Sequence, residues 1–386
     1  MNKLFSYLVA VAIALGVIVC GAGGLTSTAS AQNKPPTKEE LLALIKTPEG
    51  QELTLDEYKA VFLNYAKIEI DNKRVELKPN SIESVLRKYK KPDAKDFHVE
   101  LLSSDSPQLR TRATAEIGTA FFSTPNEYSK KLLEALKKEK EPIVLRQGVA
   151  TVSNIINQDS DAAKFVLDQA NNENPAVRAQ AAMALLNKRN IKVDGVKEAA
   201  LKLINDPDEN VRGEALRNAG DLYDESFIDE FEKVLNDPKL YFLHGDAMKG
   251  LYKLWYDRPR HEHTSQKAYE VSVKYLTKKP RTKNVPYWTS IGELQYRGYS
   301  DRDYQAWKEK ATYYSDSAWI EIMSDIAADS NADWMARKPA VEVMTEKGTK
   351  EDLEQLKAKV EALPATDSGK ERVLETIEKS LKEKDK

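Results

Sequence analysis

Apolar residues recur along most of the chain at spacings of three and four, which places them on one face of an α-helix. The segments 126–136, 196–204 and 227–235 show this pattern most clearly. No segment has the regular alternation of apolar and polar residues that is typical of a strand. The stretch 67–77 comes nearest to it and leaves a small hairpin or an irregular connection open there. The pattern predicts an all-α protein.

Several helix ends can also be located. The segment 124–127, Thr-Pro-Asn-Glu, has the composition of a capping box with Pro125 at the first helical position. Gly348 is typical of a helix end, and Thr349 with Asp352 predicts that another helix begins directly after it.

A short motif recurs and decides the architecture. It consists of a turn, often Asp-Pro or Asn-Pro, then an aliphatic residue followed by Arg, then small residues three or four positions later. The copies are anchored at Arg110, Arg146, Arg178 and Arg212, at His244 in place of Arg, and at Arg337. The first five anchors are 36, 32, 34 and 32 residues apart. The last gap of 93 residues is close to three periods, so we expect two units between His244 and Arg337 in which the motif is degenerate. A period near 33 is typical of one unit of two short helices.

These motifs resemble HEAT repeats, in particular the bacterial HEAT-like class of the phycobilisome lyases. The matching residues are the Leu-Arg or Val-Arg pairs at 109–110, 145–146, 177–178 and 211–212, with the alanines that follow them. The resemblance covers about 95–255 well and 330–386 more loosely. It implies a right-handed α-solenoid of HEAT-like helix pairs.

The resemblance also implies a role for the repeated arginines, which in that family form a polar ladder inside the stack together with the Asp or Asn of the turn. We therefore expect a structural role, and not ligand binding, for Arg110, Arg146, Arg178, Arg212 and Arg337. About function the resemblance says little, because HEAT arrays serve as scaffolds, inhibitors, lyases and hydroxylases alike.

The N-terminus has the composition of a secretory signal peptide. Lys3 supplies a short basic region, and the apolar run from Leu8 to Val19 is too short to span a bilayer comfortably. Small residues at Ala29-Ser30-Ala31 suit cleavage just before Gln32. We expect an exported chain, periplasmic or secreted, with no transmembrane segment after cleavage.

Cys20 is the only cysteine, and Val19 precedes it. A lipoprotein signal normally has a small residue at that position, so lipid anchoring at Cys20 is not expected. A mature chain without cysteine has no disulfide and no thiol nucleophile or ligand. That composition fits a protein of a bacterial periplasm better than a secreted domain that is stabilised by disulfides.

The remaining boundaries follow from where the motif is regular. We expect five parts: a signal peptide at 1–31, an N-terminal helical cap at 32–94, regular HEAT-like repeats at 95–258, irregular aromatic-rich helical repeats at 259–334, and a C-terminal HEAT-like repeat with a capping helix at 335–386. Atypical end units are what a repeat array needs to cover its outermost faces.

Composition excludes several function classes. The net charge is −2, so nothing indicates the basic stripe that nucleic-acid binding requires. The chain has no nucleophile elbow, P-loop, Rossmann glycine pattern or His-Glu-x-x-His motif. We therefore predict no cofactor, no catalytic residue and no enzymatic activity.

One metal hypothesis stays open. His261 and His263 lie two residues apart in an apparent loop, and together with His244 and Asp246 they could supply the three or four ligands of a zinc site. The alternative is a solvated loop between repeats, which we favour.

The aromatic residues are unevenly distributed, because all five tryptophans fall within 255–334. Aromatic side chains contribute much of the binding energy at interfaces. The candidate protein-binding residues are Trp288, Tyr296, Tyr299, Tyr304, Trp307 and Trp319. The alternative is that these large side chains fill the core of irregular helix pairs.

The sequence thus favours an exported, non-catalytic scaffold or adaptor that binds a protein partner in the bacterial periplasm or envelope. Two alternatives remain: a structural subunit of a periplasmic or envelope assembly, and a metal-binding protein or enzyme centred on 244–263.

Overall fold

The computed structural model describes residues 38–48, 51, 53–68, 93–121, 124–256, 264–279, 281 and 301–385. All regular structure in these residues is helical, as the sequence predicts. The predicted signal peptide and the segments 69–92 and 282–300 lie outside the described residues.

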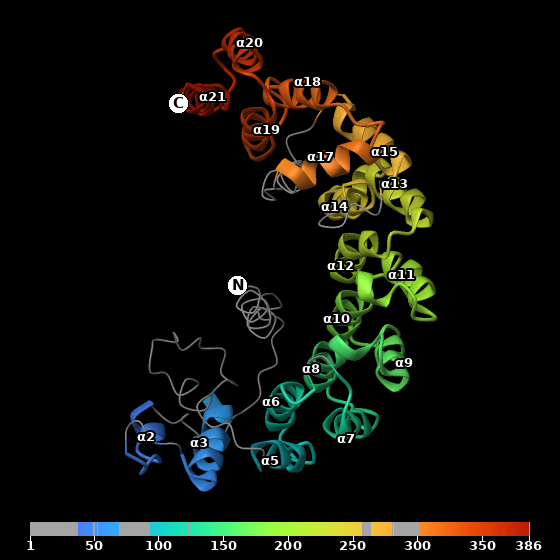
Figure 1. Ribbon diagram of the computed structural model, residues 1–386, viewed down its shortest axis with the longest axis vertical. Helices are drawn as coiled ribbons and strands as arrows, with labels where there is room; N and C mark the ends of the chain where they lie inside the picture. Colours follow the sequence, from blue (N-terminus) through green and yellow to red (C-terminus); the bar gives the residue numbers. More distant parts are fainter. Residues whose placement is uncertain are drawn as a thin grey trace. The chain divides into compact units, whose positions relative to one another are not determined.

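The helices are short, and most follow one another after brief turns (Figure 1). They are α2 (Lys38–Leu42), α3 (Leu55–Ile68), α5 (Asp93–Leu101), α6 (Pro107–Gly118), α7 (Glu127–Leu136), α8 (Pro142–Val152), α9 (Ser160–Gln169), α10 (Pro175–Leu185), α11 (Val196–Ile204), α12 (Glu209–Ala219), α13 (Ile228–Asn236), α14 (His244–Trp255), α15 (Gln266–Thr277), α17 (Asp301–Lys310), α18 (Asp316–Ala327), α19 (Trp334–Lys347), α20 (Lys350–Glu361) and α21 (Lys370–Lys384). Short 3-10 helices join some of them, including η6 (Pro238–Leu243) before α14.

The chain divides into two compact units, Met1–Phe165 and Val166–Lys386, and the boundary falls inside α9. In the first unit α6 and α8 pack directly on each other, and α7 packs against both. The predicted N-terminal cap contributes α2 and α3, and α3 packs on α5 and α6. Tyr58 and Phe62 of α3 are buried there with Phe97 of α5.

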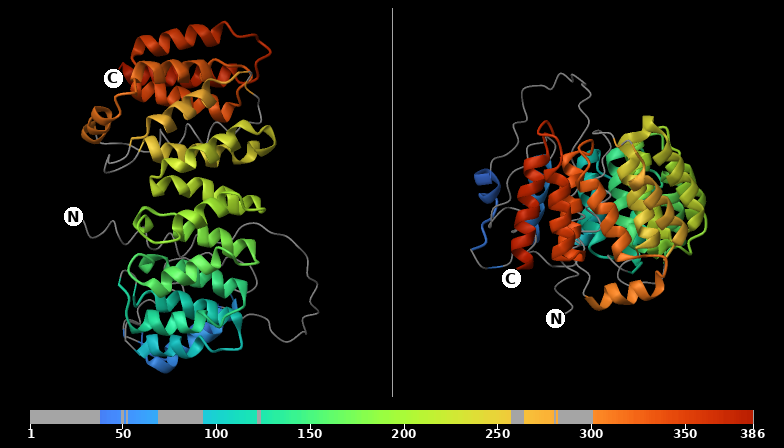
Figure 2. Two further views of the ribbon diagram at one scale, coloured as in Figure 1. Left: turned by 90° about the vertical axis from the view of Figure 1, so that its right-hand side faces the viewer. Right: turned by 90° about the horizontal axis from the view of Figure 1, so that it is seen from above.

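The second unit consists of two rows of helices followed by a C-terminal group. The motif-bearing helices α10, α12 and α14 pack in one row, while α11, α13 and α15 lie in a second row (Figure 1). Its C-terminal part continues with α18 and α19 packed together, then α20 and α21, in successive layers (Figure 2). This consecutive packing is an α-solenoid, as predicted.

All six motif copies head a helix, and their small residues lie inside. Ala181, Ala215, Ala247 and Ala340 are all buried in the second unit. Small side chains there let neighbouring helices approach closely. One close approach joins α12 to α14, where a Cβ on Gly250 would lie 2.5 Å from the Leu216 carbonyl oxygen. The pattern of apolar residues read from the sequence therefore corresponds to the core.

The predicted helix ends are confirmed in one place and wrong in another. Thr349 caps α20, and Asp352 completes the capping box by accepting from the Thr349 backbone N–H. At 124–127 the cap is Asn126, paired with Ser129, and Pro125 lies before the helix. Asn accepts from two backbone N–H groups here, so the helix begins two residues later than predicted.

Candidate functional site

Aromatic side chains from four helices form one cluster in the second unit. The aromatic cluster consists of Trp255, Tyr256, Tyr269, Tyr304, Trp307, Tyr313, Tyr314 and Trp319. Its members come from the end of α14, from α15, α17 and α18, and from the turn between α17 and α18.

Trp255 lies at the centre of this cluster. Its ring centroid is 5.1 Å from Tyr269, 5.6 Å from Trp319 and 6.0 Å from Trp307. Its indole N–H donates to the Ser272 hydroxyl at 3.1 Å, and its backbone carbonyl accepts from the Trp307 indole at 3.0 Å. A buried tryptophan with its polar atom satisfied is a core residue that fixes the neighbouring helices.

The structure describes three of the six residues predicted to bind a partner. Tyr304, Trp307 and Trp319 are all buried, with Trp307 fully inaccessible to solvent. This is the second of the two interpretations that the sequence left open, in which the aromatics fill irregular helix pairs. Trp288, Tyr296 and Tyr299 lie outside the described residues. A binding role for the six stays a prediction.

The cluster leaves almost no space inside. One cavity of about 10 Å³ lies among Trp255, Tyr304, Tyr314 and Lys347, close to the smallest volume that holds a single water. The Lys347 ammonium lies 3.7 Å from the centre of the Tyr304 ring. Burial, followed by a hydrogen bond to Asp316, raises the pKa of Tyr304, so its hydroxyl stays protonated. The cavity is too small for an organic ligand.

The ladder arginines are best described by Arg178, which ties two turns together. Its guanidinium donates to the Asn172 and Glu173 carbonyls of its own turn at 2.9 and 3.0 Å. It also donates through Nε and Nη2 to both oxygens of Asp206, 28 residues later, at 2.7 and 2.8 Å. Such a bidentate pair is among the stronger hydrogen-bonding arrangements in proteins.

The Asp206 carboxylate is held in its charged form. Burial raises its pKa, but hydrogen bonds from Arg178 and from the Asp208 backbone N–H outweigh burial. The pKa of Asp206 therefore lies below its ordinary value, and the pair is intact at neutral pH.

Two other ladder residues repeat this arrangement. In the first unit Arg110 donates to the Ser104 carbonyl and to both oxygens of Glu139, 29 residues later. In the second unit Arg337 donates to both oxygens of Asp367, 30 residues later, at 2.9 Å, and both side chains are almost fully buried.

Arg146 and Arg212 differ from these three. Within the described residues neither has a carboxylate partner, and burial lowers the pKa of Arg146. Arg212 donates to the Asp206 carbonyl at 3.2 Å, while its Nε is buried without a hydrogen-bond partner among those residues.

The metal hypothesis finds no support at His244. Its two ring nitrogens lie 3.1 Å from the Tyr275 hydroxyl and 3.1 Å from the Asp237 carbonyl oxygen, which occupies both of them in the core. His261 and His263 lie outside the described residues. Within the described part of the chain, no group of three or more His, Cys, Asp or Glu side chains could hold a metal ion.

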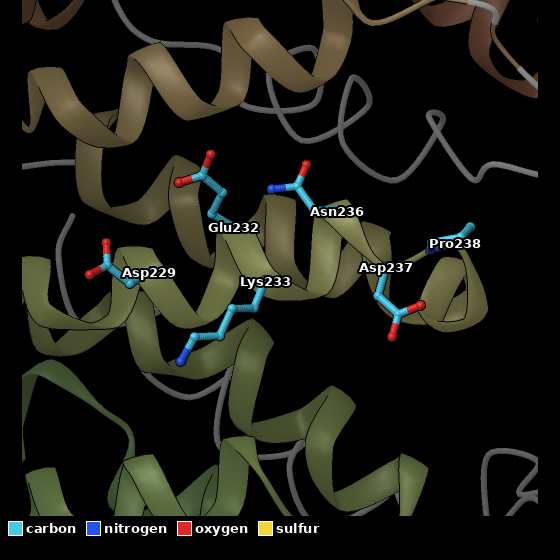
Figure 3. A pocket seen from close by; sticks show the side chains of 6 residues that line it. All are labelled: Asp229, Glu232, Lys233, Asn236, Asp237 and Pro238. Atoms are coloured by element: carbon cyan, nitrogen blue, oxygen red, sulfur yellow. The ribbon is translucent and has the colours of Figure 1, made fainter.

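A surface depression of about 650 Å³ lies along α13 and the start of η6. It is lined by Asp229, Glu232, Lys233, Asn236, Asp237 and Pro238 (Figure 3). Asp229 and Glu232 are paired with Lys267 and Lys274 of α15, and Glu232 points away from Lys233 (Figure 3). Ligand sites are mostly apolar with convergent polar groups, so this depression does not resemble one.

Charged pairs also cross between motif-bearing helices on a partly exposed surface. This motif-helix face consists of Glu214, Arg217 and Asn218 on α12, Asp221 in the 3-10 helix η4 (Gly220–Leu222) that follows it, and Asp246 and Lys253 on α14. Arg217 pairs with Asp246 at 2.9 Å, and Lys253 pairs with Asp221 at 2.7 Å. The sequence alone does not indicate this face, because the pairing depends on which helices pack against each other.

Residues 163–248 match the family model for HEAT repeats. This segment of the chain is therefore built from HEAT repeats. No curated protein matches the chain. Among solved structures, the crystal structure of an engineered protein aligns at 14% identity over 74% of this chain and 98% of that chain, with a TM-score of 0.20. A score this low adds nothing to the fold assignment.

HEAT repeats generally mediate protein–protein interaction, and HEAT solenoids are typically non-catalytic. The matched segment contains the Arg178–Asp206 pair and most of the motif-helix face. Within the described residues no helix is long and apolar enough to cross a membrane. The HEAT repeats here thus present exposed helix surfaces on a frame fixed by internal pairs.

Proposed function

We propose that this HEAT-repeat chain is an exported, non-catalytic scaffold or adaptor that binds a partner protein in a bacterial periplasm or envelope. The observation that carries the proposal is the stack of HEAT repeats itself, because an extended array offers a long surface for gripping another protein.

Affinity capture with matched surface variants tests the binding role. The tagged full chain is expressed in its native host and recovered from the envelope fraction, and bound proteins are identified by mass spectrometry. Arg217→Glu changes the motif-helix face, and Lys233→Glu, the control, changes a more exposed cation of α13 in the other row. We expect a stoichiometric partner with the unaltered chain and with Lys233→Glu, and weaker capture with Arg217→Glu.

Two results would contradict the binding role. One is recovery of no protein above a mock purification. The other is a stoichiometric metal or a measurable turnover in the purified chain, which would favour the metalloprotein alternative. Unchanged melting of both variants is the control that assigns lost capture to the surface.

Export is proposed from the signal-peptide composition alone, so it needs its own experiment. We expect the purified native protein to begin at Gln32 by mass spectrometry and to be released with the periplasmic fraction. A protein that retains Met1–Ala31 and remains with cytoplasmic markers would contradict export without affecting the binding role.

A further inference from the structure

Helix α17 is held in a different way from the other helices of the second unit. From α10 to α21, every other described helix packs closely against at least one neighbouring helix, whereas α17 lies beside the two rows (Figure 2). Among its described side chains only Tyr304 and Trp307 are buried, and they stand three residues apart on one face of the helix. A polar helix that inserts two such anchors is attached in the way that a peptide helix binds a protein surface.

The first anchor, Trp307, lies at the end of α14. Its indole N–H donates to the Trp255 carbonyl at 3.0 Å, and its ring lies 4.7 Å from the rings of Tyr256 and Tyr314. The last carbonyls of a helix have no partner inside it, so this oxygen is available as an acceptor. The Tyr313 hydroxyl also lies 3.3 Å from the same oxygen, so the carbonyl keeps a donor when the indole leaves.

The second anchor, Tyr304, contacts charged groups of α18 and α19. Its hydroxyl donates to the Asp316 carboxylate, and the Lys347 ammonium lies 3.7 Å from the centre of its ring. Asp316 also pairs with Lys308 of α17 at 2.5 Å. Both Asp316 and Lys347 are partly exposed, so water can hydrate them when α17 leaves. Release of α17 therefore strands no buried charge, unlike the separation of Arg337 from Asp367.

The docking surface is the set of aromatic and apolar side chains that α17 covers. They are Trp255, Tyr256, Tyr314, Trp319 and Val343. Trp255 packs on Trp319 with ring centroids 5.6 Å apart and donates to Ser272 of α15, and neither contact involves α17. The docking surface thus has supports of its own, and it is an apolar patch that needs a cover.

We propose that α17 is a displaceable helix that covers this docking surface, and that a helical segment of the partner protein takes its place. The segment carries a tyrosine and a tryptophan three residues apart, followed by a lysine, because these are the groups that Asp316, Lys347 and the Trp255 carbonyl receive from α17. Helix α17 and the partner compete for one surface, so α17 limits binding until the partner arrives. This inference rests on the proposed binding function and specifies the chemistry that is recognised.

The partner is unidentified, so the probe is a dye-labelled synthetic peptide of residues 301–311. Its binding to the full chain is measured by fluorescence anisotropy, with the unaltered chain and with the double variant Tyr304→Ala and Trp307→Ala. We expect the double variant to bind about tenfold more tightly or better, because a tethered helix competes at an effective concentration of about 1 mM. Within the peptide, Trp307→Ala should abolish binding, and Glu309→Gln at an exposed position is the matched control.

Hydrogen exchange tests the displacement in the chain without any substitution. We expect the amides of α17 to exchange faster than those of α14, because two side chains and no neighbouring helix hold α17 in place. Saturating peptide should accelerate the exchange of α17 further, since the peptide occupies the docking surface. The dye separates the mass of the peptide from that of the same segment in the chain.

The inference is overturned if α17 is protected as strongly as α14, or if the peptide does not accelerate its exchange. Equal binding of the Trp307→Ala peptide by a double variant that circular dichroism shows to be folded would overturn it as well. If the double variant does not fold, hydrogen exchange of the unaltered chain decides. A partner captured from the envelope fraction by a chain whose α17 is not displaced leaves the binding role intact and removes only this docking surface.

Discussion

Two regions of the second unit hold neighbouring helices together by different means. Around α10 and α12, small residues let the helices approach, and the Arg178–Asp206 pair ties successive turns. Around α14 to α18, large rings centred on Trp255 fill the space between helices, and the arginine anchor is replaced by His244. The first means repeats with the period of the chain, whereas the second depends on one local fit of side chains.

The comparison explains why the motif fades where the aromatics gather. A polar pair needs two residues at a fixed separation, so it leaves a periodic trace in the sequence. A packed cluster needs only total volume and shape, so its members can stand at irregular spacings. Loss of the repeat pattern after 255 therefore marks a change in the type of core, and the helical stack continues through it.

The largest effect is expected from Trp255→Ala in the aromatic region. The residue is fully buried, and its removal leaves a cavity surrounded by rings from three helices. Large-to-small changes of this kind cost about 3–5 kcal/mol. Urea unfolding measures the loss in the free energy of unfolding. The transition is monitored by far-UV circular dichroism, because tryptophan fluorescence would itself change in this variant. A cost below that of Met335→Ala, an exposed control, would show that the cluster does not hold the helices.

The next effect concerns the buried ladder pair. Asp367→Ala leaves the Arg337 guanidinium buried without its carboxylate, and breaking such a pair costs about 3 kcal/mol or more. The double variant Asp367→Leu with Arg337→Met removes both charges and should be more stable than the single variant. Thermal unfolding of the three proteins provides the test. If the double variant is the least stable of the three proteins, the unpaired charge of Arg337 does not cause the loss of stability in Asp367→Ala.

A titratable group in the first unit extends the comparison to pH. His98 lies among Tyr58, Phe62 and Phe97, its Nε2 is 2.8 Å from the Tyr58 hydroxyl, and its Nδ1 lacks a hydrogen-bond partner within the described residues. Burial, together with the nearby charges of Lys95 and Arg112, lowers the pKa of His98 to about 3.

The sign of the pH effect follows from that lowered pKa. Between pH 6.5 and about 3 the unfolded chain binds a proton at His98 and the folded chain does not, so stability falls as the pH falls. The expected slope in this window is at most about 1.4 kcal/mol per pH unit. Denaturant titrations at several pH values measure it. The same slope in His98→Gln would assign the effect to other groups.

The smallest effect is expected at Arg212 of the ladder. Arg212 makes one backbone hydrogen bond and has no carboxylate partner in the described residues, so Arg212→Gln should cost less than about 1 kcal/mol. Arg178→Gln should cost clearly more, because it leaves the buried Asp206 without its partner. Thermal unfolding of the two variants compares them directly, and equal losses would mean that the carboxylate adds nothing to the ladder.

The fold could be predicted because its signals are local and repeated. The motif anchors head helices and the small residues after them are buried, since helix starts and apolar faces depend on nearby residues alone. Asp206 belongs to an Asp-Pro turn, whose acid the resemblance assigns to the ladder, and it pairs with Arg178. The motif alone does not single out Glu139 and Asp367, although they lie 29 and 30 residues after their arginines.

The candidate site was harder to predict, because exposure depends on how helices pack. Nothing in the local sequence separates a surface tryptophan from Trp307, whose indole N–H reaches the Trp255 carbonyl 52 residues away. Tyr241 and Phe242 are exposed next to Leu240, whose backbone departs from helical geometry, and no spacing rule indicates that exposure.

The separation between each ladder arginine and its carboxylate has a consequence for changes in chain length. The arginine heads one unit and the acid lies in the turn of the next, so the pair measures the 28–30 residues between them. An insertion inside a helix of that span shifts one charge relative to the other, whereas an insertion in the surface loop between the two helices can leave both charges in place. The ladder therefore restricts insertions and deletions within the helices of each unit more than those in its surface loops.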